Sequence, residues 1–189
     1  MNTKNICIVH TSSGYLARVA SSIIVNDFIL NTANDLSRRV FFCLIDNSSS
    51  KEDFFTYLEK LNNYITYPVH GILLPENKGH SDGEADCISQ SLQYLLGEPI
   101  DLIVKLSGKM FYMFDKLSDD LSLLSSSNIL VSPSVFKIGS DCFSEQFPSS
   151  ISTSHFICRR DKSILDMFFN PSFLKSELSL EERFSLVLK

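Results

Sequence analysis

A lysine inside an otherwise apolar segment is the first residue of this sequence that points to chemistry. Lys105 lies between Val104 and Leu106 in the string DLIVKLSGK, and Lys109 follows four residues later. Burying an unpaired lysine costs several kcal/mol, so Lys105 needs an anionic partner if this segment is a buried strand. A pyrophosphate or an acidic side chain would serve. On an edge strand, the lysine would instead extend its ammonium group to solvent.

Polar and small residues also follow two earlier apolar segments. The first segment runs into Thr11, Ser12 and Ser13 ahead of Gly14, and the second ends at Asp46. An acceptor-only carboxylate such as Asp46 selects hydroxyl and N–H donors, so it could bind a ribose hydroxyl or a base imide. The string Asp-Asn-Ser-Ser equally allows an Asx turn or a helix N-cap.

A further polar loop contains Asn77, Lys78 and Gly79 and leads into a predicted helix. Backbone N–H groups at a helix start favour phosphate, and Lys78 would add a cation. The alternative is a left-handed turn at Gly79 with a solvated lysine. The chain contains neither G-x-G-x-x-G nor G-x-x-x-x-G-K-[ST], which argues against a dinucleotide-binding fold and against a P-loop.

These polar stretches must be brought together by the elements that precede them. Apolar segments of strand length alternate with segments of helical length and periodicity in the first half of the chain. The predicted strands are 5–11, 39–45, 69–74 and 101–106, and the predicted helices are 19–30, 51–64 and 82–96. This alternation predicts a mostly parallel sheet with helices on both faces. Ligands of such sheets bind beyond the carboxyl ends of the strands, where the polar stretches lie.

The second half of the chain is less regular. Short apolar stretches predict strands at 129–131, 135–138 and 151–158. Helical periodicity predicts helices at 161–169 and 179–188, and Ser179 precedes Glu182 by three residues, which is the spacing of a capping box.

Composition places the chain among ordinary globular proteins. It has 189 residues, of which 44% are hydrophobic and 21% charged, which suits a single domain. The formal net charge of -5 excludes a basic nucleic-acid-binding footprint over the whole chain. The five scattered cysteines form no C-x-x-C pair and predict buried, reduced thiols in the cytosol. No stretch has the length of a spanning helix or a signal peptide, so we expect a cytoplasmic protein.

Several of these strings resemble those of a known enzyme class. LIDNSSSKEDF resembles the turn after the second strand of GT-A glycosyltransferases, and PENKGHSDGEADCISQSLQYL resembles the segment before their central metal-binding motif. Where most of those enzymes have D-x-D, this chain has KLSGK, which is similar to a group of small bacterial sugar transferases of surface-polysaccharide synthesis. The resemblance covers most of the chain. It implies an α/β fold: one Rossmann-like GT-A-type domain, with residues 1–110 as the nucleotide-sugar-binding half and 111–189 as the acceptor-side half.

The resemblance also implies a set of donor-binding residues. They are Thr11, Ser12, Ser13, Asp46, Asn77, Lys78, Gly79, Lys105, Gly108 and Lys109. Without the D-x-D carboxylates no metal site is expected. Lys105 and Lys109 would then neutralise the diphosphate leaving group as a metal ion otherwise does.

An inverting sugar transfer needs a general base for the acceptor hydroxyl. In GT-A enzymes this base tends to be a late carboxylate, which implies Glu181 or Glu182, although Glu182 also completes the capping box. Asp82 and Glu84 are rivals for the same role. His155 could contact acceptor or phosphate, or belong to the core, and the pair Arg159 and Arg160 could bind phosphate or simply be solvated at a strand end.

The implied function is glycosyl transfer from a nucleotide-sugar to a glycan or lipid-linked glycan, without a metal or other cofactor. Peripheral association with the inner face of a membrane would accompany a lipid-linked acceptor. The alternative is a non-catalytic GT-A-like interaction domain within a polysaccharide-assembly complex, which the missing D-x-D and the short chain favour. A nucleoside diphosphate that stabilises the protein without added metal would favour the enzyme.

Overall fold

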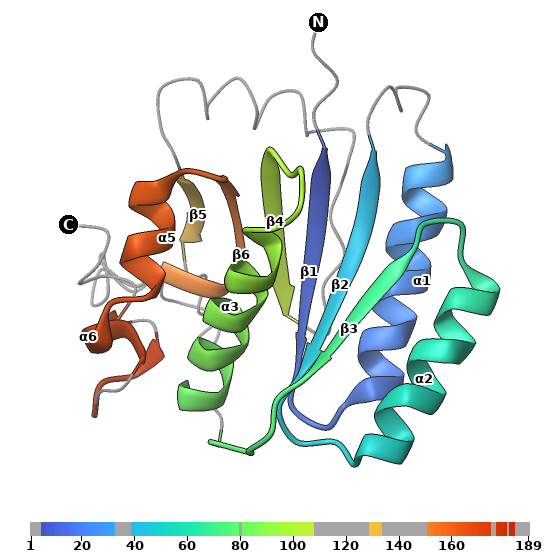
Figure 1. Cartoon of the computed structure of the whole chain (residues 1–189), viewed down its shortest axis with the longest axis horizontal. Helices are drawn as coiled ribbons and strands as arrows, with labels where there is room; N and C mark the ends of the chain where they lie inside the picture. The colour runs from blue at the N-terminus through green and yellow to red at the C-terminus, as the bar shows by residue number, and fades with distance from the viewer. Residues whose placement is uncertain are drawn as a thin grey trace, which may run out of the picture.

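A six-stranded sheet with the order β3-β2-β1-β4-β6-β5 forms the centre of the molecule (Figure 1). The computed structural model describes residues 5–32, 39–79, 81–107, 129–133, 151–174, 177–180 and 182–183. The strands are β1 (Ile6–Ser12), β2 (Val40–Asp46), β3 (Val69–Leu73), β4 (Leu102–Ser107), β5 (Ile129–Pro133) and β6 (Ile151–Arg159). Strands β1 to β4 are parallel, and β6 runs antiparallel to both of its neighbours, β4 and β5.

Helices cover both faces of this sheet. Helices α1 (Leu16–Thr32) and α2 (Lys51–Tyr64) lie side by side on one face, whereas α3 (Ser81–Leu95), α5 (Lys162–Phe168) and α6 (Pro171–Leu174) lie on the other (Figure 1). Alternate strand residues therefore enter two separate cores. In β1, Ile6 and Ile8 pack with α1 and α2, whereas Cys7 and Val9 pack toward α3.

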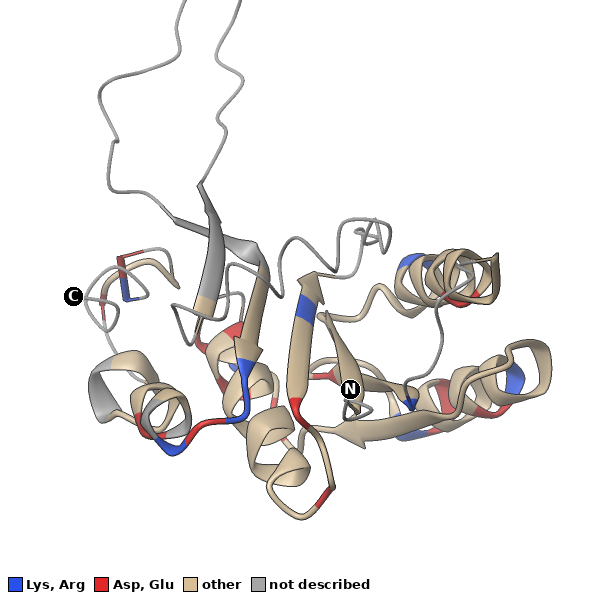
Figure 2. Cartoon of the chain, turned by 90° about the horizontal axis from the view of Figure 1, so that it is seen from above, with Lys and Arg blue, Asp and Glu red and all other residues tan. Residues whose placement is uncertain are grey.

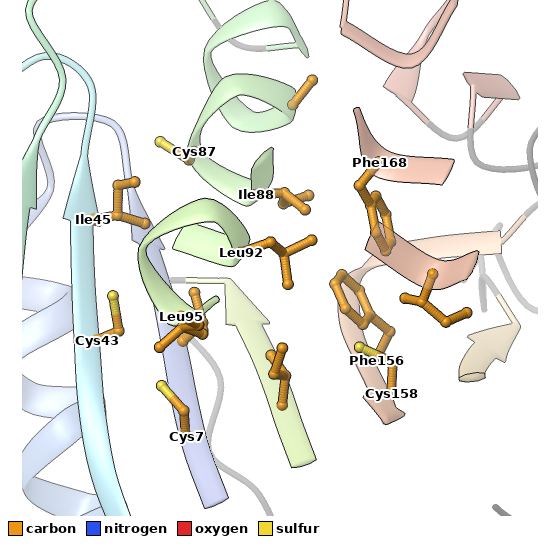
Figure 3. Packing of buried hydrophobic residues seen from close by; sticks show 14 of the residues in the cluster. Cys7, Cys43, Ile45, Cys87, Ile88, Leu92, Leu95, Phe156, Cys158 and Phe168 are labelled. Atoms are coloured by element: carbon orange, nitrogen blue, oxygen red, sulfur yellow. The ribbon is translucent and has the colours of Figure 1, made fainter. Parts of the chain in front are cut away.

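The core on the α3 face anchors that helix against the sheet. Figure 3 shows Ile88 and Leu92 of α3 lying close to Phe156 of β6 and Phe168 of α5. The rings of Phe156 and Phe168 are stacked with their centroids 5.3 Å apart, and each of these four side chains is at most 1% exposed. Burial of this apolar surface holds α3 in place, with its N-terminus at the carboxyl edge of the parallel strands.

The winding of the chain reverses between β1 and β4. From β1 the chain proceeds outward to β2 and β3, and α3 then carries it back across the opposite face to β4, on the other side of β1. In open α/β sheets, the crevice at such a switch point is where ligands bind. Here Thr11 of β1 and Ser107 of β4, which are register partners, mark the switch point.

The predicted fold class is confirmed. The predicted helix 51–64 coincides with α2, and all four predicted parallel strands are present. Helix α1 begins at Leu16, three residues earlier than predicted, because Leu16 is buried one turn before Val19. Strands β5 and β6 and helix α5 are also present, whereas α6 was not predicted. The predicted strand 135–138 lies outside the described residues, and within 179–188 the described helical residues are 180, 182 and 183.

The described cysteines are buried free thiols, as predicted: Cys7, Cys43, Cys87 and Cys158. Burial raises the pKa of Cys43 and of Cys158 to about 12, so neither thiol is a nucleophile at neutral pH. Cys142 lies outside the described residues. Among the helices that the structure describes, none is both long and apolar enough to cross a membrane.

Candidate functional site

Four polar side chains meet at the switch point, on the α3 face of the sheet. Thr11 comes from β1, Lys105 and Ser107 come from β4, and Glu84 comes from α3. Oε1 of Glu84 accepts hydrogen bonds from Lys105 Nζ, from Ser107 Oγ at 3.1 Å and from Thr11 Oγ1 at 3.4 Å. Lys105 Nζ also donates to Ser107 Oγ at 3.2 Å. We term these four residues the α3-side cluster.

The cluster contains the anionic partner that the sequence required for Lys105. The side chain of Lys105 is 1% exposed and that of Glu84 is 15% exposed, and the two form an ion pair. Of the two partners predicted for the lysine, the acidic side chain is the one present in the structure. The edge-strand alternative is wrong, because β4 lies between β1 and β6. A central strand gives the ammonium group of Lys105 a fixed position near the carboxyl ends of the parallel strands.

Three acidic residues at the start of α3 each hold a cation from a different segment. The pairs are Asp82 with Arg183 (2.6 Å), Glu84 with Lys105, and Asp86 with Lys78 (2.8 Å). Carboxylates are favourable at a helix N-terminus because they complement the helix dipole. The pairs therefore attach the first turns of α3 to β4, to the preceding loop and to the C-terminal segment.

Arg183 is a residue that the sequence analysis missed. It is 2% exposed, and its guanidinium donates to the carbonyl oxygens of Leu178 at 2.9 Å and Phe173 at 3.3 Å in addition to its ion pair with Asp82. No local pattern in the sequence marks it, since a Glu-Glu-Arg run in a predicted helix is typical of a solvated face.

Asp46 organises the loops on the other side of β1. Its Oδ1 accepts from the amides of Ser48 at 2.9 Å and Ser49 at 2.6 Å, and its Oδ2 accepts from the amide of Gly14 at 3.0 Å. Burial raises the pKa of Asp46, but the Ser12 hydroxyl and these three amides outweigh that effect and hold the pKa below its ordinary value. The Asx-turn alternative is thus present, while the predicted contact with a ribose or base remains a prediction. The N-cap of α2 is Ser50 instead.

Asn47 connects three loops at the carboxyl edge, and the sequence analysis did not single it out. Its Oδ1 accepts from Ser13 Oγ at 2.9 Å, and its Nδ2 donates to the carbonyl oxygen of Gly79 at 3.2 Å. Gly83 lies beneath the amide, where an added Cβ would be 1.8 Å from Asn47 Nδ2. A glycine in the first turn of a helix was the available signal, because it costs helix stability unless close packing requires it.

The loop before α3 has the local geometry of a turn. Asn77 Oδ1 accepts from the amide of Gly79 at 2.9 Å, and Gly79 has a φ of 78°, in the left-handed region. Lys78 is 46% exposed, and its hydrogen bond to Asp86 raises its pKa. The turn alternative is therefore present at Gly79, and Lys78 has a protein carboxylate as its partner. Phosphate binding by this loop remains a prediction.

A cleft of about 550 Å³ opens on the opposite side of the same edge, between the N-termini of α1 and α2. Its lining includes Tyr15, Arg18, Ser48, Ser49, Ser50 and Tyr57. The Tyr15 side chain is 58% exposed, and the guanidinium of Arg18 lies 5.1 Å from the centre of its ring. We term this opening the α1–α2 cleft. An aromatic face, a cation and several hydroxyls give it the groups needed to bind a planar, polar ligand.

The side chain of His10 lies on the α1 face of the sheet, whereas that of its neighbour Thr11 lies on the α3 face. His10 is fully buried, and its Nε2 lies 3.2 Å from Asn26 Nδ2 of α1. Since an amide nitrogen can only donate, Nε2 accepts and the imidazole is neutral. Burial, with a further contribution from the positive charge of Lys105, lowers the pKa of His10 to about 3. His10 is therefore a neutral core residue at physiological pH.

The predicted general bases are only partly described. Glu182 forms the predicted capping box: its Oε2 accepts from the amide and the hydroxyl of Ser179, each at 2.8 Å. These bonds lower the pKa of Glu182, which makes it a weaker base. Glu181, Gly108 and Lys109 lie outside the described residues, as does the side chain of His155.

Arg159 and Arg160 lie at the other end of the sheet. Arg159 is the register partner of Leu102 at the start of β4, so both arginines are far along the strand from Ser107. Arg160 donates to the carbonyl oxygens of Leu96 and Glu98. Both residues lie in the turn directly after the C-terminal end of α3. Arg160 thus stabilises the turn that follows α3, and the structure does not bring it to the switch point. Figure 2 shows that most charged residues lie on the helices and loops rather than within the strands.

Comparisons with known proteins agree with this fold. The structure is similar to that of the 4-diphosphocytidyl-2C-methyl-D-erythritol synthase of Anaerococcus prevotii, with a TM-score of 0.61 and 13% sequence identity over 98% of this chain and 83% of that one. It is also similar to S. aureus TarS 1-349, with a TM-score of 0.57 and 16% identity over 98% of this chain and 55% of that one. A further similar structure is mouse xyloside xylosyltransferase 1, with a TM-score of 0.53 and 10% identity over 99% of this chain and 82% of that one. The chain thus spans about half the length of the TarS fragment.

No protein-family model matches the chain, and no curated protein sequence matches it. At these low identities the structural similarity establishes the fold alone, a single α/β domain with a mostly parallel sheet flanked by helices.

Proposed function

We propose that this protein is a glycosyltransferase that uses a nucleotide-sugar donor. The observation that carries the proposal is the α3-side cluster, in which a buried lysine and two hydroxyls converge at the topological switch point of the sheet. This is the position where α/β sheets of this type bind their ligands. Among the structural neighbours, TarS 1-349 has been solved in complex with UDP (TM-score 0.51, 15% identity, 84% of this chain and 47% of that one).

In this proposal the donor lies along the carboxyl edge. Lys105 and the hydroxyls of Thr11 and Ser107 bind the diphosphate, which carries negative charge that a fixed ammonium group stabilises as the leaving group departs. The nucleoside extends toward the loops after β1 and β2, where the exposed ring of Tyr15 offers a stacking surface. Lys105, with Lys109, replaces a metal ion in this role.

The acceptor that we propose is a glycan or a lipid-linked glycan of a surface polysaccharide. The similarity of the KLSGK string to small bacterial sugar transferases supports this part of the proposal. Among the candidate general bases, the Glu182 carboxylate already accepts two hydrogen bonds from Ser179.

A second candidate function is nucleotidyl transfer. The synthase from A. prevotii forms a diphosphocytidyl compound, and this chain covers 83% of its length. A reaction of this kind would join a nucleoside monophosphate unit to a sugar phosphate and release pyrophosphate from a nucleoside triphosphate. The same lysine would then stabilise the pyrophosphate.

The test is a thermal-unfolding screen of the intact protein with UDP, GDP, CDP, ADP and dTDP, each with EDTA and with Mg²⁺ or Mn²⁺. We expect one diphosphate to raise Tm by several degrees in EDTA, because a ligand that binds only the native state stabilises it. That nucleotide, linked to candidate sugars, is then used in hydrolysis and transfer assays. A shift that requires a metal would contradict metal independence. No shift with any nucleotide would favour the non-catalytic domain, and pyrophosphate release from CTP would favour nucleotidyl transfer.

The ligand-induced Tm shift should be lost in Lys105→Ala, and the control for that variant is the substitution Lys162→Ala. Lys162 forms an exposed ion pair with Asp166 on α5. Its removal changes the net charge by the same amount as removal of Lys105 but leaves the switch point intact. It should leave the ligand-induced Tm shift unchanged.

A further inference from the structure

The position that an anionic ligand would take beside Lys105 is already filled by a carboxylate of the protein. Oε1 of Glu84 accepts from the ammonium of Lys105 and from the hydroxyls of Ser107 and Thr11. Three donors from two adjacent parallel strands thus converge on one oxygen atom. A phosphate oxygen is bound by the same kinds of donor.

We propose that Glu84 is a built-in competitor of the donor diphosphate, which must displace the Glu84 carboxylate before it can bind Lys105. This inference rests on the proposed function, because it concerns the same site. Glu84 would then set the affinity of the site for its ligand. The free energy needed to break the Glu84–Lys105 ion pair reduces the binding free energy of every anion that takes its place.

The two partners of this ion pair differ in their freedom to move. Lys105 is 1% exposed and lies on a central strand with register partners on both sides. Glu84 is 15% exposed and lies in the first turn of α3, at the open edge of the sheet. A glutamate has three side-chain torsions, so its carboxylate can turn toward solvent while the helix stays in place. The lysine is therefore the fixed part of the site and the glutamate the exchangeable part.

The neighbouring ion pairs on α3 lack this arrangement. Asp86 pairs with Lys78, which is 46% exposed, and Asp82 pairs with Arg183, which is also held by backbone carbonyl groups. Neither aspartate receives hydroxyl donors from two strands among the described contacts. A carboxylate outside the predicted site serves as the control: Asp166 of α5, which forms an exposed ion pair with Lys162.

The test uses inorganic pyrophosphate as the probe, so that it does not depend on the nucleobase. Calorimetric titration compares the wild-type protein with Glu84→Gln and Asp166→Asn. The glutamine keeps the size of the side chain and an acceptor oxygen for Lys105 but removes the competing charge. We expect the Kd of Glu84→Gln for pyrophosphate to fall at least tenfold, and that of Asp166→Asn to change less than twofold.

An unchanged or raised Kd in folded Glu84→Gln would overturn the inference and make Glu84 a purely structural partner of Lys105. If Glu84→Gln does not fold, Glu84→Asp takes its place. That side chain keeps the charge but is one methylene shorter, and it should lower the Kd about threefold by withdrawing from Lys105. An unchanged Kd there would equally overturn the inference.

The nucleotide measurements separate this inference from the proposed function. If the function is wrong and the inference right, Glu84→Gln gains affinity for pyrophosphate, while UDP, GDP, CDP, ADP and dTDP bind no tighter than pyrophosphate itself. If the function is right and the inference wrong, one nucleotide binds preferentially and Glu84→Gln does not alter its affinity.

Discussion

The α3-side cluster and the α1–α2 cleft occupy the two sides of one sheet edge and differ in almost every physical property. The cluster is buried, charged and internally paired through Lys105 and Glu84. The cleft is open, and an exposed tyrosine with an arginine over its ring lines it. Under the proposed function, the fixed charge of the cluster binds the diphosphate, and the open cleft receives the nucleoside attached to it.

Asp46 and Asn47, at the end of β2, connect the two regions, and we term this pair of residues the joint. Asp46 binds the amides that shape the cleft side, and Asn47 reaches across to the loop before α3. Because each side chain connects loops that are far apart in sequence, a substitution at the joint should alter both the α3-side cluster and the α1–α2 cleft. The four predictions below test this division, from the largest expected effect to the smallest.

The largest effect should come from Glu84→Leu in the cluster. Removing the carboxylate leaves the ammonium of Lys105, which is 1% exposed, as an uncompensated buried charge, so we expect the free energy of unfolding to fall by about 3–5 kcal/mol. Urea-induced unfolding measures this change. The control is Lys78→Met, which removes an exposed ion pair and should cost less than about 1 kcal/mol. Similar losses in the two variants would contradict the contrast between buried and exposed pairs.

The second effect concerns pH and His10, on the cleft side of the sheet. Its folded-state pKa of about 3 lies below the ordinary value of 6.5, so the unfolded state binds the proton first as pH falls. Its contribution to stability is complete above about pH 6.5 and is lost as pH falls toward 3. Between pH 7 and pH 5 we expect this residue to account for a loss of about 2 kcal/mol.

The variant His10→Gln checks this assignment by urea-induced unfolding at both pH values. A glutamine does not titrate, so the difference in stability between pH 7 and pH 5 should shrink in the variant by that amount. Equal pH dependence in the two proteins would show that other groups cause the loss.

A smaller effect is expected from Gly83→Ala, beside Asn47 of the joint. The new Cβ would be 1.8 Å from Asn47 Nδ2, so the asparagine must move and lose its bonds to Ser13 and Gly79. Overpacking together with two lost hydrogen bonds should cost about 1–3 kcal/mol, against an intrinsic gain in helix propensity of about 1 kcal/mol. Thermal unfolding measures the sum. A more stable variant would mean that Asn47 does not hold the loops together.

The smallest effect on stability is expected from Tyr15→Ala in the cleft. The exposed ring is held by one cation–π contact, so its loss should cost less than about 1 kcal/mol. If a base stacks on this ring, the affinity for the nucleoside diphosphate should fall about tenfold, whereas the affinity for pyrophosphate should not change. Equal losses for both ligands would place Tyr15 next to the phosphates rather than the base.

The sequence predicts features that depend on residues close together along the chain, and it does not predict contacts between residues far apart along the chain. Helix α2 was predicted to the residue because Ser50, Phe54 and Leu61 encode its cap and its buried face locally. The need of Lys105 for an anion was also predicted, because desolvation of a charge does not depend on the partner. The identity of that partner was not predicted, since Glu84 lies 21 residues away on another element. For the same reason Arg183 and Asn47 were missed.

The sequence by itself determined the alternation of strands and helices, the parallel sheet and the presence of a buried cation at its carboxyl edge. These follow from hydrophobic periodicity and from the cost of burying charge, which act within a few residues along the chain. Only the tertiary structure decided that Glu84 occupies the place beside Lys105, that Asp46 binds backbone amides and that Arg160 lies at the opposite edge. Each of these depends on which elements pack together, because a polar side chain pairs with whatever group the folded chain brings within its reach.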